Sequence, residues 1–181
     1  MTQNRLWIPV LALLMCGSLA RAQATKEKSK HVATDKDRHS HVMLTPDEIT
    51  WQSPPPATGL PPSMKVAILQ GDPTKAGDHY TMRIWHEDGF KVPPHRHVTD
   101  ENLVVIEGTF LMGVGETYDE TAIRALPVGS YARMPQGVPH FALCEGETVV
   151  EVHGVGPFVV NLVNPKDPFR GATYKQRKGQ D

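Results

Sequence analysis

The chain has 181 residues, and its 19 basic and 20 acidic side chains almost cancel. No basic block occurs in the part expected to fold, which excludes a footprint for nucleic acid or for an anionic membrane surface. A small molecule is therefore the expected partner.

The first 24 residues have the pattern of a secretory signal peptide. Arg5 precedes a short apolar run, Leu6–Leu14, and an Ala-x-Ala exit lies within Ala20–Ala24. The run is shorter than the ~20 apolar residues that span a bilayer, and Met15 before Cys16 fits a lipoprotein signal poorly. We expect export to the periplasm or beyond, with no membrane anchor. The alternative is a buried N-terminal helix.

The segment after the signal peptide is charged and has few apolar residues. Removing the signal peptide takes away two basic residues and no acidic one, which leaves a net charge of −3, and Cys144 becomes the last cysteine, so no disulfide forms within the chain. Residues 25–42 cannot bury enough surface to offset chain entropy, which predicts a flexible leader. Its His31, His39 and His41 are expected to be solvated, and loose capture of metal ions is the alternative.

A short helical turn and a proline-rich strap are predicted next. Thr45–Glu48 combines a capping Thr, a Pro at the first helical position and a Glu three residues after the cap. Trp51 is expected to pack against the main domain. Pro54–Pro56 and Pro61–Pro62 are expected to run extended across its surface.

The remainder up to Val163 consists of short apolar runs separated by Gly, Pro and Asp, which is the spacing of an all-β sandwich or barrel. No stretch of helix length shows a 3.6-residue apolar period. We expect one jelly-roll domain over residues 43–165, a double-stranded β-helix, followed by a loose basic tail over 166–181. The expected strands are Lys65–Leu69, Tyr80–His86, Lys91–His97, Asn102–Glu107, Thr109–Val114, Ala122–Leu126, Ser130–Met134, His140–Cys144, Thr148–His153 and Phe158–Val163.

Four side chains in this region have the spacing of a metal site. His95 and His97 are separated by one residue, so an extended strand places them on the same face. Glu101 keeps the same parity if the chain stays extended. His140 follows a turn at Pro135–Gly137 and supplies a fourth candidate ligand.

The two segments that carry these residues resemble the two motifs of the cupin family. Cys144 stands where the second motif usually ends in Asn. The resemblance covers roughly residues 60–165 and implies a cupin barrel that holds one metal ion through the four residues above. The single barrel is also similar to the cupin half of ChrR-like, zinc-binding anti-sigma regulators. The matching positions are Gly89, His95, His97, Glu101, Gly108, Gly129, Pro135, Gly137 and His140.

Three neutral imidazoles and one carboxylate suit a divalent transition metal. Imidazole fits Zn, Cu, Fe and Ni, and the carboxylate admits Mn. Four protein ligands would leave a six-coordinate metal with two open positions, as in a catalytic site rather than a closed structural one. The alternative, an ordinary polar core, would bury three histidines with an unpaired carboxylate at a high cost. Arg5 has no twin arginine beside it, so the metal is expected to be acquired after export, which favours Cu or Zn over Fe.

The sequence offers only weak candidates for catalytic residues outside the ligand set. Val150 and Val152 alternate with Glu151 and His153. Either the valines enter the core, or Glu151 and His153 face the barrel mouth, where His153 is the better candidate for a proton shuttle. Cys144 is expected to be a buried small hydrophobe rather than a nucleophile.

Three functions fit these patterns. The first is a metal-dependent enzyme that acts on a small oxygen-bearing molecule, either dioxygenase-like or an isomerase or decarboxylase. The second is a module that binds or senses a small ligand or a metal, and the third is a structural or storage role. The fold alone does not separate them. A homodimer would cover the exposed strand edges of such a barrel.

Overall fold

The computed structural model describes residues 41–167 and 169. The signal peptide predicted over 1–24 lies outside these residues, as do nearly all of the predicted leader and tail. The described part confirms the predicted all-β fold class, since its helical segments are short 3-10 turns. The strands are β1 (Lys65–Gln70), β2 (His79–His86), β3 (Lys91–His97), β4 (Glu101–Val114), β5 (Arg124–Pro127), β6 (Tyr131–Met134), β7 (His140–Val155) and β8 (Val160–Leu162).

The predicted N-terminal turn is present as η2 (Pro46–Glu48). The backbone N–H of Thr45 donates to the Glu48 carboxylate at 2.8 Å, so the acidic side chain satisfies a donor that the turn leaves open. The prediction for Trp51 was wrong. Its side chain is 38% exposed, because the chain joins the barrel only at the next residue.

The proline-rich strap lies along the edge strand β1. Gln52 exchanges two backbone hydrogen bonds with Val66, each 2.8 Å long. A second turn, η3 (Pro56–Thr58), then directs the chain over the barrel, and Leu60 and Met64 pack against the core. The strap thereby supplies apolar side chains to the interior as well as covering an edge.

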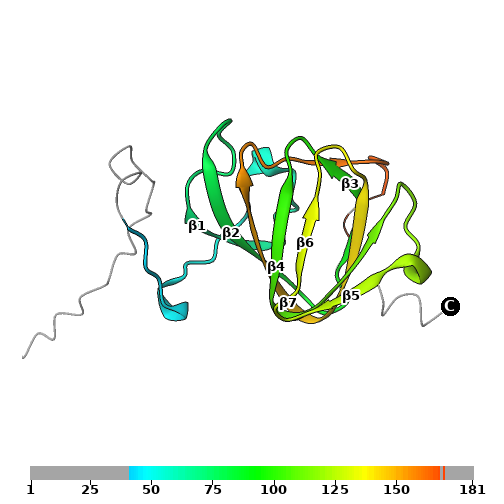
Figure 1. Cartoon of the computed structure of the whole chain (residues 1–181), viewed down its shortest axis with the longest axis horizontal. Coiled ribbons are helices and arrows are strands. Elements are labelled where there is room, and N and C mark those ends of the chain that lie inside the picture. The colour runs from blue at the N-terminus through cyan, green and yellow to red at the C-terminus, as the bar shows by residue number, and fades with distance from the viewer. Residues whose placement is uncertain (1–40, 168, 170–181) are drawn as a thin grey trace, which may run out of the picture. The chain divides into compact units, whose positions relative to one another are not determined.

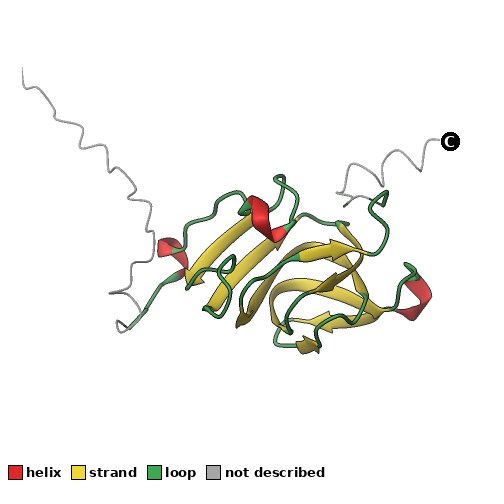
Figure 2. Cartoon of the chain, turned by 90° about the horizontal axis from the view of Figure 1, so that it is seen from above, coloured by secondary structure: helices red, strands yellow, loops and turns green. Residues whose placement is uncertain are grey.

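Two long antiparallel strands, β4 and β7, form the frame of the barrel. They pair from Asn102 opposite His153 to Val114 opposite His140, with register shifts on both sides of Glu107. The second half of β7 has β2 as its other neighbour, whereas the first half has β3. β7 therefore pairs with a different strand along each half of its length. Figure 1 and Figure 2 show the strands curled around one interior.

The sequence predicted four shorter strands where β4 and β7 run continuously. The expected breaks, at Gly108 and at 145–147, are bends within strands, because glycines with positive φ turn the chain without ending the pairing. β5 begins at Arg124, after the predicted start at Ala122, because residues 120–122 form a 3-10 turn capped by the Asp119 carboxylate. In contrast, β3 has the predicted bounds.

Gly108 sits at a bend where the backbone leaves no room for a side chain. Its φ is +71°, and a Cβ there would lie 2.6 Å from the Thr148 hydroxyl and closer still to the Glu147 carbonyl. Gly146 has a similar φ of +76° but open space around it. We expect Gly108→Ala to lower the free energy of unfolding by about 2–5 kcal/mol, from strain and overpacking.

The matched Gly146→Ala variant should lose only the cost of the left-handed backbone, about 1–2 kcal/mol. Urea denaturation of the two variants checks the difference. Equal losses would contradict the close approach of β4 and β7 at Gly108.

Candidate metal centre

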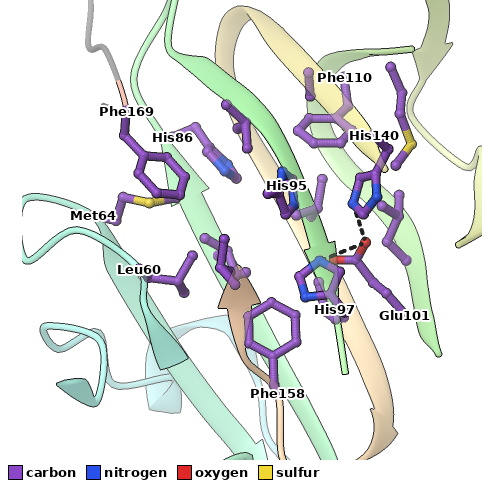
Figure 3. Close-up of a pocket in the computed structure, with 18 residues that line it drawn as sticks. Leu60, Met64, His86, His95, His97, Glu101, Phe110, His140, Phe158 and Phe169 are labelled. Atoms are coloured by element: carbon purple, nitrogen blue, oxygen red, sulfur yellow. Dashed lines mark ion pairs between the residues drawn. The ribbon is translucent and has the colours of Figure 1, made fainter. Parts of the chain in front are cut away.

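The four predicted ligands come from the ends of three strands and meet inside the barrel. His95 and His97 close β3, Glu101 opens β4, and His140 opens β7. All four are buried, with side chains directed to one interior point (Figure 3). The structure therefore brings together residues that are up to 45 positions apart in the chain.

Two local features of β3 position its histidines. Pro93 and Pro94 have no backbone N–H to donate, and the pairing of β3 with β7 shifts register between Val92 and His95. After the shift, His95 stands directly opposite His140, and their ring centroids are 4.2 Å apart. The irregular stretch thus directs His95 inward beside its cross-strand partner.

The turn before His140 is bonded to the end of β3. The Gly137 N–H donates to the His97 carbonyl at 3.0 Å, and the Gln136 N–H donates to an Asp100 carboxylate oxygen at 2.8 Å. These two contacts hold His140, from the second motif, beside the candidate ligands of the first motif.

The ligand atoms converge at distances that suit one cation. One nitrogen of each of His95, His97 and His140 lies within 4.8 Å of the other two. Glu101 Oε2 lies 3.2 Å from His140 Nε2 and 3.5 Å from His97 Nε2. Ligand atoms at right angles around a metal with bonds of about 2.0–2.2 Å are ~3 Å apart, so this spacing is close to that of a coordinated ion.

Backbone carbonyls determine which nitrogen of each imidazole faces inward. The Nδ1 atoms of His95, His97 and His140 lie 2.8, 3.0 and 3.0 Å from the carbonyl oxygens of Pro93, Val159 and Val138. Because a carbonyl only accepts, each Nδ1 carries the proton and each Nε2 presents a lone pair.

These lone pairs make the centre a match for a cation. Within the described residues, the Nε2 atoms of His97 and His140 are buried without a hydrogen-bond donor, and the Glu101 oxygen that lies 3.5 and 3.2 Å from them is itself an acceptor. Acceptors that converge without a donor repel one another, and a divalent ion removes the conflict. The three histidines could therefore hold a metal, with Glu101 adjacent.

Electrostatics favour the protonation states that bind metal. Burial lowers the pKa of His95 to about 3, and the neighbouring His140 and His97 act in the same direction. Burial opposes ionisation of Glu101, but any proton held at the centre by His97 or His140 faces its carboxylate and attracts it, and this attraction outweighs burial and holds the pKa of Glu101 well below the usual range. His95 is therefore neutral and Glu101 ionised at neutral pH.

A cavity of about 40 Å³ lies beside these residues and has mainly apolar walls. This volume holds more than one water molecule. The walls include Leu60 and Met64 from the strap, Phe110 and Phe158 from the barrel, and Phe169 near the end of the described chain (Figure 3). A small molecule bound there would contact mainly apolar side chains.

One polar residue of this cavity, His86, is not among the candidates that the sequence indicated. It lines the same space and is 3% exposed. The signal was available, because His86 continues the alternation of Tyr80, Met82 and Ile84 on the buried face of β2.

Glu151 and His153, the weak catalytic candidates, do not line the cavity. Val150 and Val152, which alternate with them, are buried instead, and the Glu151 carboxylate pairs with Arg83 at 2.9 Å. The alternation of β7 therefore places the polar pair away from the interior, which corrects the hypothesis of a proton shuttle. Cys144 is fully buried, and burial raises the pKa of its thiol to about 12, so it is not a nucleophile.

A family model described as "Domain of unknown function (DUF4437)" matches residues 43–161. No curated protein matches the chain. No helix in the described ranges is long and apolar enough to cross a membrane.

Several solved structures are similar to the chain at low identity. KdgF from Halomonas sp. is 18% identical, with 65% of this chain and 96% of that chain covered and a TM-score of 0.47. An RmlC-like cupin from Shewanella frigidimarina NCIMB 400 is 16% identical, with 70% and 96% covered and a TM-score of 0.46. A mutant of salicylate 1,2-dioxygenase from Pseudoaminobacter salicylatoxidans, in complex with gentisate, is 15% identical, with 59% and 27% covered and a TM-score of 0.43.

Proposed function

Because the chain belongs to the DUF4437 family, whose description assigns no activity, we propose a function from its own site. The protein is a cupin that holds one divalent transition metal and acts as a metal-dependent enzyme on a small oxygen-bearing molecule. The observation that carries this proposal is the convergence of three Nε2 lone pairs and one carboxylate on a shared point without a donor among them.

The set of four ligands supports a metal site with free coordination positions. His95, His97, His140 and Glu101 would hold the ion and leave room for further ligands on the cavity side. When bound, a divalent ion supplies a Lewis acid and a template for two oxygen atoms of the same molecule. Oxygenation, isomerisation and decarboxylation are the reaction classes that such a centre serves.

The residues around the centre have separate roles in this proposal. The backbone carbonyls of Pro93, Val138 and Val159 fix the imidazole orientations. Phe110 and Phe158 exclude water from the bound molecule, and the stacked Phe158 ring, 4.7 Å from that of His97, also limits ring rotation.

A non-catalytic binding module is the second candidate, and one observation favours it. Among the described residues that line the cavity, His86 is the only polar side chain beyond the four ligands. An enzyme that needs both an acid and a base would have to use the metal centre for one of them.

The proposal includes export. The signal-peptide pattern implies that the ion is taken up outside the cytosol, where the affinity order favours Cu or Zn. We expect protein isolated from its native compartment to contain about one equivalent of Cu or Zn per chain by elemental analysis. Iron as the sole metal would contradict this assignment.

Turnover distinguishes the two candidates. The metal-loaded protein should consume oxygen with catechol-like or flavonol-like compounds, or convert a member of a sugar-phosphate panel. Stoichiometric metal without turnover across both panels would favour the binding module.

A further inference from the structure

The fourth imidazole of the cavity, that of His86, has no role in the proposed metal centre. His86 ends β2, and its ring lies beside those of Phe90 and Phe110, with centroid distances of 5.5 and 5.8 Å. Figure 3 shows the ring among the side chains that line the cavity. His86 and Glu101 line the same cavity, so one bound molecule could contact both.

The hydrogen bonding of His86 is incomplete. Burial lowers its pKa to about 4, so the ring is neutral at neutral pH and has one N–H. The backbone of Thr148 favours the protonated ring, as a carbonyl acceptor does. Nδ1 is buried without a partner.

The imidazole of His86 therefore lacks one hydrogen-bond partner. If the single N–H is directed to the Thr148 carbonyl, the remaining nitrogen is an acceptor. A buried polar atom without a partner costs about 1–3 kcal/mol, and a hydroxyl group on a bound molecule would remove that cost.

The net charge of the metal centre restricts the charge of the group that binds the metal. Three neutral imidazoles, one carboxylate and a divalent ion sum to one positive charge, and the neutral His86 adds none. The other walls are apolar, formed by residues such as Leu103, Val150 and Val152. A monoanion would neutralise the centre, whereas a dianion would leave a net charge in an apolar space.

We propose that His86 is a specificity-determining residue that accepts a hydrogen bond from a hydroxyl group of a small monoanion whose other end chelates the metal. The ligand class is a short 2-oxo or 2-hydroxy carboxylate with a further hydroxyl group. This inference rests on the proposed metal centre and adds the class of molecule that it takes.

A pair of probes tests it, since hydroxypyruvate and pyruvate share the chelating 2-oxo carboxylate and differ in one hydroxyl group. Full-length protein loaded with Co²⁺ is titrated with each anion, and the visible absorption of the ion reports binding. We expect hydroxypyruvate to bind about five- to tenfold more tightly than pyruvate, the worth of one net hydrogen bond.

His86→Phe should abolish that preference while retaining Co²⁺, because its neighbours Phe90 and Phe110 tolerate a ring of similar size. His79→Phe is the matched control: it removes an exposed histidine from the start of the same strand and should keep the preference.

A second measurement requires no variant. In ¹⁵N NMR of the Zn²⁺-loaded protein, hydroxypyruvate should shift the acceptor nitrogen of His86, and pyruvate should leave it nearly unchanged. Equal affinities for the two anions, a preference that survives in His86→Phe, or an unmoved His86 signal would each overturn the inference. Failure of the metal centre itself is recognised separately, because the wild-type protein would then take up no Co²⁺, and the inference would fall with it.

Discussion

Replacing His95 and His97 together by alanine is expected to lower the affinity for divalent metal by well over about 100-fold, since loss of an outer partner of a ligand alone costs about 10–100-fold. Both side chains are buried, and their Nε2 atoms face the shared point. The barrel should still fold, because its core does not depend on these rings, but without the stabilisation that metal adds. Elemental analysis after dialysis and calorimetric titration with Zn²⁺ measure the effect.

A control separates the loss of ligands from the loss of imidazoles in general. The double variant His79→Ala with His153→Ala also removes two histidines, and neither of them lines the cavity. It should bind one equivalent of metal as tightly as the wild-type protein does. Full occupancy in the His95 and His97 double variant would show that the assigned ligands are wrong.

The metal-free protein is expected to lose stability steeply as the pH falls below about 6.5. Burial lowers the pKa of His86 from 6.5 to about 4 and that of His95 to about 3. Between these values the unfolded chain binds protons that the folded chain does not, so the free energy of unfolding falls with pH. Two such groups lower it by about 4 kcal/mol between pH 7 and pH 5.

Glu101 acts in the same direction at lower pH. Its pKa is lowered in the folded state, so its contribution is present above pH 4.5 and is lost as the pH falls below that value. Urea denaturation in the presence of a chelator, from pH 7 to pH 5, measures the slope. His86→Phe should show about half of the wild-type loss over this range, and an unchanged slope would contradict a buried neutral imidazole at this position.

The sequence predicted the gathering of the four candidate ligands because their spacing follows strand geometry. His95 and His97 share a face by the period of two, and β3 occupies the predicted residues. The inward nitrogen of each ring was not predictable. It depends on backbone partners such as Val159, which lies 62 positions from His97 and reaches it only after folding.

Other features required information about the neighbouring strands. Four predicted strands form the two continuous strands β4 and β7, because the bends within them leave the pairing intact. A glycine in the sequence does not by itself distinguish a bend from a break. The alternation of β7 was equally compatible with Glu151 inside or outside. The contact of Glu151 with Arg83 on β2 shows its direction.

The cavity wall has a consequence for shortened forms of the protein. Leu60 and Met64 come from the segment before β1, and Phe169 follows β8, yet all three line the cavity. A fragment trimmed to the eight strands would keep the hydrogen-bonded barrel and the candidate ligands but would lose these side chains. Water would then reach the centre from that side, so the smallest piece that folds and the smallest piece that binds its natural ligand have different lengths.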